Sequence, residues 1–284
     1  MDYLIIGTVT KDLLQDGTFT IGGTVTYAAR TALAIGCQVR VITSAAPEFD
    51  LDLVLSGCDV MRVPAEDTVT FENVYTPSGR QQYLHAQAES LDLGAVPRVW
   101  RKPDIVHLAP LAGDVDPALA DAFPGALVGV TPQGWLRAWD EKGRVFYRDW
   151  ADAEQVLPRV DAVIMSQEDV SGDEATIRLF AASARILVVT MGAAGCRVFA
   201  NGQERRVPVK PMNEVDPTGA GDIFAAAYLI HFRQVGDPWL AAHYANCVAS
   251  LSVSRSGWAG TPGPDDIAGI GSLSSLLSSS CGVV

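Results

Sequence analysis

The chain has 284 residues, 48% hydrophobic and 19% charged, so it can bury a large core as one domain or two. Its formal net charge of -12 argues against a nucleic-acid partner, because phosphate backbones are bound by clustered Lys and Arg. No apolar run approaches the roughly 18 to 20 residues that span a bilayer, and no basic segment precedes residues 4–6. We therefore expect a cytoplasmic protein with no membrane partner. Five scattered cysteines without a Cys-x-x-Cys pair indicate reduced thiols, and the four histidines share no zinc-ligand spacing.

Short Val/Ile/Leu-rich runs alternate with alanine-rich stretches along the chain. Continuous apolar runs are typical of buried parallel strands, and we expect strands at 3–7, 38–43, 105–108, 126–130, 162–165 and 186–190. The intervening stretches predict helices at 26–35, 116–123, 151–157 and 173–183. This alternation indicates one α/β domain over residues 1–284, with a doubly wound, mostly parallel sheet flanked by helices.

One region departs from the alternation. Residues 68–75 and 80–88, joined by 76–79, predict a polar hairpin, and 18–21 predicts another extended piece. An antiparallel appendage on a parallel core suggests a small β-sheet lid at about 9–21 and 68–90, and the alternative is an ordinary edge hairpin. The last third predicts helices over the apolar run 223–232 and over 238–254. A short helix and a loose tail are expected after residue 266.

The most informative segment is Asp216-Pro217-Thr218-Gly219-Ala220-Gly221-Asp222, directly before the apolar run. Gly219, Ala220 and Gly221 bring backbone N–H groups to a helix N-terminus, where the macrodipole favours an anion. A carboxylate beside an anion site is electrostatically costly unless it takes up a proton, so Asp222 is a candidate general base for phosphoryl transfer. The alternative interpretation is a glycine-rich turn, capped by Asp222, that leads into a core helix.

Other candidate residues follow the predicted strands, where ligands of open α/β sheets bind. Asp12 and the pair Gly22-Gly23 are placed to meet a polyol, because one carboxylate can accept from two vicinal hydroxyls. The turn Thr190 to Gly195 suits a nucleotide phosphate, and Glu168 offers a hard oxygen ligand for Mg²⁺ through water. Arg137 is a candidate phosphate partner. Taken singly, each of these residues also fits a turn, cap or surface role.

Together the motifs resemble the ribokinase-like, or phosphofructokinase-B, carbohydrate kinases, which phosphorylate sugars, nucleosides and related alcohols with MgATP. The resemblance rests on Gly22-Gly23 before a helix ending at Gly36, on the strand and turn from Val188 to Gly195, and on Asp216 to Asp222. These motifs stand in the family's order and spacing over nearly the whole chain. The resemblance implies an ATP-binding transferase with Mg²⁺ as cofactor.

Carried over by residue, the resemblance makes Asp222 the catalytic base and Gly219, Ala220 and Gly221 the anion hole. It implies that the acceptor is bound by Asp12, Gly22, Gly23, Tyr27 and Arg137, and the nucleotide by Thr190, Gly192, Gly195 and Asn246. Family members that need a monovalent cation hold it near the anion hole. Residues at similar places here are Asp216, Thr218, Gly257 and Thr261, which makes K⁺ a candidate second cation.

Two departures bear on the substrate. The family's Asn-x-x-Glu motif is Met165-Ser166-Gln167-Glu168 here, and Thr24 and Tyr27 replace the Lys and Asn that follow the double glycine in ribokinases. The runs 7–12, 21–27 and 133–137 are instead similar to a myo-inositol kinase branch. We therefore expect a sugar or cyclitol acceptor, with a nucleoside as alternative, for which Tyr27, Phe71 and Tyr83 are candidate base-stacking residues. A non-catalytic sugar- or nucleotide-binding regulator is the other alternative, and either a monomer or a homodimer fits.

Overall fold

The computed structural model describes residues 1–76, 79–209 and 212–277. Its centre is a 9-stranded sheet in the order β15-β14-β13-β12-β9-β8-β1-β4-β5, parallel except for the two pairs that involve β14. Its strands are β1 (Asp2–Gly7), β4 (Gln38–Ala45), β5 (Asp59–Pro64), β8 (Ile105–Ala109), β9 (Leu127–Val130), β12 (Ala162–Ser166), β13 (Ile186–Thr190), β14 (Cys196–Ala200) and β15 (Gln203–Val207). The predicted α/β class and the predicted parallel strands are confirmed.

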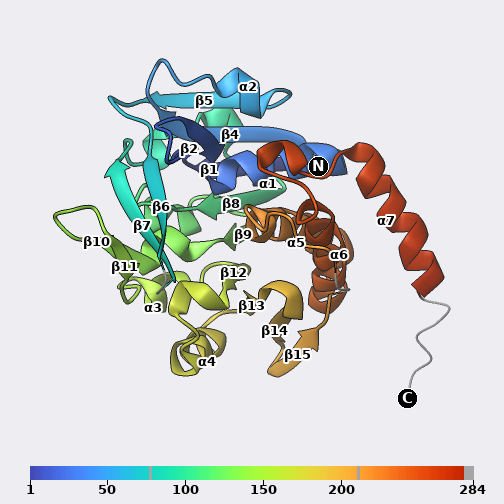
Figure 1. The fold of residues 1–284 in the computed structure, drawn as a ribbon. Helices are drawn as coiled ribbons and strands as arrows, with labels where there is room; N and C mark the ends of the chain where they lie inside the picture. The colour runs from blue at the N-terminus through green and yellow to red at the C-terminus, as the bar shows by residue number, and fades with distance from the viewer. Residues whose placement is uncertain (77–78, 210–211, 278–284) are drawn as a thin grey trace.

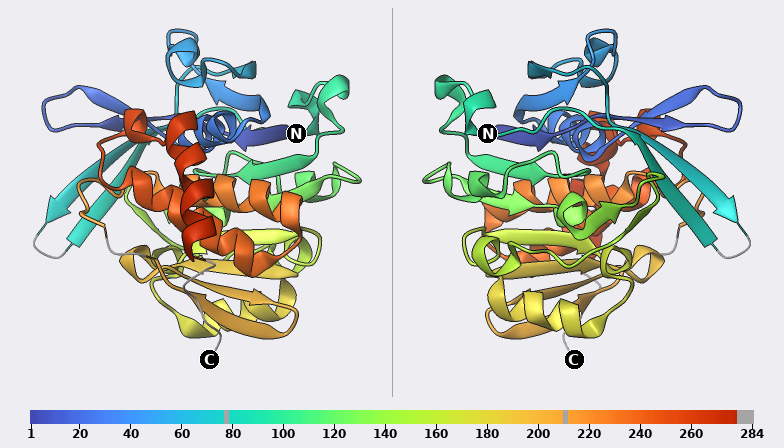
Figure 2. Two further views of the ribbon diagram at one scale, coloured as in Figure 1. Left: turned by 90° about the vertical axis from the view of Figure 1, so that its right-hand side faces the viewer. Right: turned by 90° about the vertical axis from the view of Figure 1, so that its left-hand side faces the viewer.

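Helices cover both faces of this sheet (Figures 1 and 2). One face carries α1 (Thr24–Ile35), α2 (Leu51–Leu55), α5 (Ala220–Val235) and α6 (Pro238–Ser252), and α7 (Pro264–Leu277) packs outside α1 and α6. The other face carries α3 (Ala153–Val156), α4 (Glu174–Ser183) and the 3-10 helices η3 (Pro117–Asp121) and η4 (Pro132–Leu136). Alternation along β1 explains the two cores, because Tyr3 and Ile5 belong to the first and Leu4 and Ile6 to the second.

A second, four-stranded sheet in the order β3-β2-β6-β7 projects from one side of the domain, and Figure 2 shows both of its hairpins extending beyond the same edge of the large sheet. Its strands are β2 (Thr10–Leu13), β3 (Phe19–Gly22), β6 (Thr70–Thr76) and β7 (Gly79–Ala86). Each hairpin is antiparallel, but β2 and β6 pair in parallel, so the sheet is mixed rather than purely antiparallel as expected. Part of the predicted turn at 76–79 lies outside the described residues.

Three predicted helices differ from the structure. The stretch 116–123 forms only η3, and 151–157 contracts to α3; both elements end shortly before a proline, Pro124 or Pro158, which has no backbone N–H to continue a helix. The expected short helix after residue 266 is instead the 14-residue α7, which begins earlier, at Pro264. Its start is favoured by Pro264 at the first position and by Asp265 and Asp266 in the first turn. The expected tail at 278–284 lies outside the described residues.

The remaining elements are short. They are the hairpin β10 (Arg137–Trp139) and β11 (Val145–Tyr147), and the 3-10 helices η1 (Leu93–Ala95), η2 (Arg98–Trp100), η5 (Gln167–Val170), η6 (Gly192–Ala194) and η7 (Trp258–Gly260). Within the described ranges, no helix combines the length and apolar character needed to cross a membrane.

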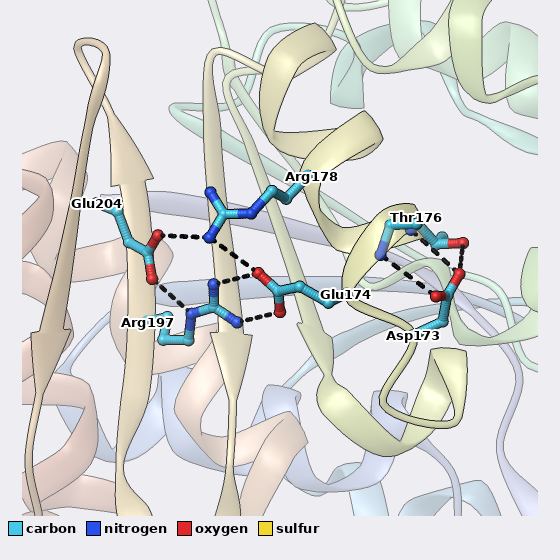
Figure 3. Close-up of polar contacts among 7 residues, drawn as sticks. Asp173, Glu174, Thr176, Arg178, Arg197 and Glu204 are labelled. Atoms are coloured by element: carbon cyan, nitrogen blue, oxygen red, sulfur yellow. Dashed lines mark hydrogen bonds and ion pairs between the residues drawn. The ribbon is translucent and has the colours of Figure 1, made fainter.

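An ion-pair network links α4 to the antiparallel edge of the large sheet (Figure 3). The Arg197 guanidinium on β14 donates two hydrogen bonds to Glu174, at 2.7 and 2.8 Å, and one to Glu204 at 2.8 Å. Arg178 bridges the same two carboxylates from α4. Because the Arg197 side chain is only 9% exposed, the network stabilises this edge more than an exposed ion pair would.

Candidate active site

A cavity of about 730 Å³ lies between the small sheet, the N-terminus of α5 and the carboxyl ends of β12 and β13. It brings together most residues singled out in the sequence, although they come from all parts of the chain. Its walls include Asp12, Gly23, Tyr27, Arg137, Glu168, Thr190, Gly192, Gly195, Asp216, Thr218, Gly219, Ala220, Gly221, Asp222 and Asn246. Four candidates are not among the lining residues, namely Gly22, Tyr83, Gly257 and Thr261.

The small sheet supplies one wall through alternate residues of its strands. Asp12 of β2 and Phe71 of β6 are register partners, and Asn73 of β6 pairs with Gln82 of β7. All four line the cavity, and the Gln82 Nε2 amide donates to Asn73 Oδ1 at 3.1 Å. Tyr83, the next residue, is not a lining residue, and its hydroxyl donates to Gln81. The expected stacking role of Tyr83 is therefore wrong, because neighbouring residues of a strand point to opposite faces.

Gly22 does not line the cavity, but its lack of a side chain shapes the cavity wall. A Cβ built on Gly22 would overlap the Asp12 carboxylate and lie 2.8 Å from the Thr10 hydroxyl. The missing side chain therefore leaves room for Asp12 beside the cavity. Gly23 is needed for the chain path, since its φ of +90° lies in the region that glycine tolerates and a Cβ would lie 2.7 Å from the Thr8 carbonyl oxygen.

A second part of the wall is the start of α5. Gly219 precedes the helix with φ +78°, a conformation that favours glycine, and a side chain there would overlap the Tyr27 ring. The first turn of an α-helix has backbone N–H groups without intrahelical acceptors, so this end is electrostatically suited to an anion. One of the three predicted anion-hole residues is partly engaged, because the Ala220 N–H donates to the Pro217 carbonyl at 3.1 Å.

Asp222 lies in this first turn, half-buried at the cavity wall. Thr24, the first residue of α1, donates its hydroxyl hydrogen to Asp222 Oδ1 at 2.7 Å. The pKa of Asp222 is raised to about 6, and burial is the largest cause. The charges of Asp169 and Asp12 raise this pKa further, whereas the Thr24 hydrogen bond and the charge of Arg137 lower it. The carboxyl group thus changes charge close to neutral pH, which suits a group that accepts and releases a proton.

The far end of the cavity lies beyond β13. Thr190 ends this strand and donates to the Met165 carbonyl at 3.3 Å. Gly195, with φ +84°, turns the chain into β14 at a point where a Cβ would overlap the Val207 carbonyl oxygen. The Asn246 amide from α6 donates to that same oxygen at 3.0 Å. Several lining residues at this end are apolar, namely Val209, Met212, Val215, Ala249 and Val253.

The predicted cation ligands are Glu168 for Mg²⁺ and a separate set for K⁺, namely Asp216, Thr218, Gly257 and Thr261. Glu168 lines the cavity from η5, beside Ser166. Asp216 accepts the Thr218 N–H through Oδ1 and the Gly257 N–H through Oδ2, each at 2.9 Å, so it ties Gly257 to the loop before α5. The Thr261 hydroxyl donates to the Trp258 carbonyl at 2.7 Å. Among the described residues, no cluster of three or more His, Cys, Asp or Glu side chains could hold a metal ion on its own.

Several lining residues escaped the sequence interpretation. Thr24 was noted only as a departure from a pattern, because its contact with Asp222 spans 198 positions and leaves no local signal. Asn73 and Gln82 could have been found by extending the period-2 alternation of the predicted hairpin from Phe71. Gln133 lines the cavity, and its Nε2 amide donates to Asp169 at 3.0 Å.

Comparisons with known proteins define the class. A model of the pfkB family of carbohydrate kinases matches residues 152–264. A cytidine kinase of Thermococcus kodakarensis is 28% identical in an alignment over 252 residues, with coverage of 82% of this chain and 89% of that protein. The inositol 3-kinase of Zea mays is 38% identical over 103 residues, but these cover only 35% of this chain and 26% of the maize protein.

Solved structures share the architecture. A pyrophosphate-dependent kinase of the ribokinase family, complexed with a pyrophosphate analogue and myo-inositol, superposes with a TM-score of 0.78, 23% identity, and coverage of 94% of this chain and 99% of that one. The fold is therefore the ribokinase fold, and the protein is a phosphotransferase with an alcohol group as acceptor. Residues 152–264 match the model of the pfkB family of carbohydrate kinases, and the chain is similar to kinases over most of its length.

Proposed function

We propose that the protein transfers the γ-phosphoryl group of ATP to a hydroxyl of a sugar or cyclitol, with a myo-inositol-like acceptor favoured. One observation carries the proposal. The Asp222 carboxylate stands in the first turn of α5 beside Gly219 and Gly221, in the cavity that Asp12 lines from the small sheet. A carboxylate would repel an anion bound beside it, so it is a poor choice for a residue that only binds the anion. The same carboxylate has a catalytic use when it removes a proton from an attacking hydroxyl.

The acceptor side is built for several hydroxyl groups. Asp12 accepts hydrogen bonds when ionised, whereas the paired amides of Asn73 and Gln82 have both donor and acceptor atoms beyond their mutual hydrogen bond. Arg137 lies beside this wall, with its guanidinium carbon 5.9 Å from the Phe71 ring centroid. This mixture of donors and acceptors supports a compact polyol, and the partial likeness to the maize inositol 3-kinase supports a cyclitol.

In the proposed transfer, the acceptor hydroxyl gives its proton to Asp222 as its oxygen attacks the γ-phosphorus in line with the leaving oxygen of ADP. The backbone N–H groups at the start of α5 stabilise the charge that develops on the equatorial phosphoryl oxygens. We propose that the small sheet acts as a lid over the acceptor, which would exclude water as a competing acceptor.

The donor end supports a nucleotide rather than pyrophosphate. The apolar lining residues Val209, Val215 and Val253 suit a purine base, a group that ATP has and pyrophosphate lacks. Thr190, Gly192 and Gly195 are proposed to line the phosphates, with Asn246 nearer the base.

The lining residues fit Mg²⁺ that is held through water. Mg²⁺ keeps several waters and takes further ligands from substrate phosphates, so a single carboxylate such as Glu168 suffices for the protein's share. When bound, Mg²⁺ would neutralise charge on the transferring phosphates. For K⁺, the candidate residues Asp216 and Gly257 lie together, and Asp216 Oδ2 accepts the Gly257 N–H. We propose that K⁺ activates the enzyme at this place, and a titration of activity with K⁺ tests it.

A donor and acceptor panel tests the function. The enzyme is incubated with Mg²⁺, either ATP or pyrophosphate, and each of myo-inositol, other cyclitols, fructose, ribose and cytidine, and product is followed by ³¹P NMR. We expect phosphorylated cyclitol or sugar with ATP and no product with pyrophosphate. Transfer from pyrophosphate alone, or no transfer to any polyol, would overturn the proposal.

A nucleoside is the second candidate acceptor. Phe71 and Tyr27 both line the cavity and offer aromatic surface to a base, and the relative with the longest alignment described above is a cytidine kinase. The same panel separates the candidates, because a nucleoside kinase should prefer cytidine over myo-inositol by at least about tenfold in kcat/KM, a difference that a single base-stacking contact can supply.

A further inference from the structure

Thr24 occupies an unusual position between the two walls of the cavity. It follows Gly23, whose φ of +90° turns the chain sharply from the small sheet into α1. Thr24 is 3% exposed, so its side chain has little access to water. Because α1 packs directly against α5, this first turn of α1 faces the first turn of α5, where Asp222 stands.

The hydrogen bond between these two turns has one direction. A threonine hydroxyl has one hydrogen, and an ionised carboxylate can only accept, so the Thr24 hydrogen is directed to Asp222 Oδ1 at 2.7 Å. This bond restrains rotation of the carboxyl group about its Cβ–Cγ bond. It also engages one carboxylate oxygen on the side of α1, which leaves Oδ2 as the oxygen for the acceptor hydroxyl.

We propose that Thr24 is a positioning residue that presents Oδ2 of Asp222 to the acceptor hydroxyl and stabilises the ionised form of the base. The inference rests on the proposed role of Asp222 in phosphoryl transfer. It assigns Thr24 no contact with the reacting atoms. Its hydroxyl acts through Asp222, which receives the proton from the acceptor as the phosphorus–oxygen bond forms.

The charges around Asp222 explain why such a donor is useful. Burial opposes ionisation of Asp222, and the nearby carboxylates of Asp169 and Asp12 oppose it further. Arg137 favours ionisation by its charge, and Thr24 favours it by hydrogen bonding. Removing the Thr24 hydroxyl should therefore raise the pKa of Asp222 above about 6, and the base would be protonated over more of the neutral range.

The test compares Thr24→Val, which replaces the hydroxyl by a methyl group, with Thr24→Ser, which keeps it. Thr31→Val is the matched control, because Thr31 is also buried in α1 but donates to the Tyr27 carbonyl, at 2.8 Å. For Thr24→Val we expect the acidic limb of the kcat/KM profile to move up by about one pH unit, a tenfold change in proton affinity, and kcat to fall about tenfold. Thr24→Ser should restore both, and Thr31→Val should move neither.

A titration without substrate separates this inference from the proposed function. The Asp222 carboxyl carbon is followed by ¹³C NMR against pH, with Asp222→Asn used to assign its signal. A higher pKa in Thr24→Val supports the inference even if no tested acceptor is phosphorylated. An unchanged pKa and pH profile, or a rise in acceptor KM alone, would overturn it. If Thr24→Val does not fold, Thr24→Ala, which leaves room for water, is titrated in its place.

Discussion

The Tyr27 ring fills the space that a side chain on Gly219 would occupy. Gly219 has φ +78° and directly precedes α5, whereas Tyr27 belongs to α1 and lines the proposed acceptor part of the cavity. The proposed anion site and the proposed acceptor wall are therefore in direct contact. This contact couples the two parts of the proposed mechanism, although Tyr27 and Gly219 lie 192 positions apart in the sequence.

Replacing Gly219 by Ala should disable transfer. The new Cβ would overlap the Tyr27 ring and strain a backbone that favours glycine, so the start of α5 should shift away from the phosphoryl oxygens. We expect kcat to fall by about 100-fold or more, comparable to the loss of one oxyanion donor. Gly17→Ala is the control, since φ there is +81° and a Cβ would meet nothing within 4 Å. Equal loss in both variants would show that backbone strain alone is responsible.

Replacing Gly22 by Ala should weaken acceptor binding more than turnover. The Cβ would displace the flexible Asp12 carboxylate rather than backbone, so the fold should persist while the proposed polyol contact is lost. We expect the acceptor KM to rise about tenfold or more, with the KM for ATP nearly unchanged. Because both changes act on one carboxylate, Gly22→Ala combined with Asp12→Asn should cost little more than Asp12→Asn alone. Additive effects would contradict this explanation.

The raised pKa of Asp222 has a consequence for stability. The folded protein holds this proton more tightly than the unfolded chain, so the ionised carboxyl group destabilises the fold above about pH 6, and this loss is recovered as pH falls toward about 4. Asp222→Asn should therefore raise the melting temperature at pH 8, and the gain should shrink toward pH 4. Thermal unfolding across pH 4–8 checks this, and a gain that does not vary with pH would refute it.

The network at Arg197 predicts a loss of stability that is separate from catalysis. Arg197→Met keeps the apolar part of the side chain but removes three charged hydrogen bonds to Glu174 and Glu204 (Figure 3). We expect the free energy of unfolding to fall by about 1–3 kcal/mol, with kcat unchanged, because the network is not among the cavity-lining residues. Arg205→Met, which changes an exposed arginine on β15, is the control. Equal losses in both variants would show that Arg197 has no special role.

The alternation of buried strands and helices was legible in the sequence, because the central parallel strands are apolar on both faces, whereas the partly exposed edge strand β5 was not predicted. The start of α5 was legible too, since Gly219 and Asp222 belong to one contiguous motif. The pairing between the two hairpins could not be predicted, because the parallel alignment of β2 with β6 joins distant segments, with Lys11 opposite Thr70, 59 positions later.

Within the site, the sequence pointed to residues but not to their contacts. Asp12 was predicted from its place after the first strand. The structure was needed to show why residue 22 is a glycine, because a side chain there would overlap the Asp12 carboxylate. Thr24 stood out only as a departure from the expected lysine, because a hydrogen bond across 198 positions depends on the packing of α1 against α5.

The most direct measurement of the central claim is single-turnover phosphoryl transfer from ATP to the preferred polyol by wild-type protein and Asp222→Asn, with ATP affinity measured in parallel. The proposed base predicts that Asp222→Asn binds ATP with nearly unchanged affinity and transfers at least about 100-fold more slowly, a loss typical of a missing general base. A transfer rate for Asp222→Asn close to that of the wild type would contradict the account.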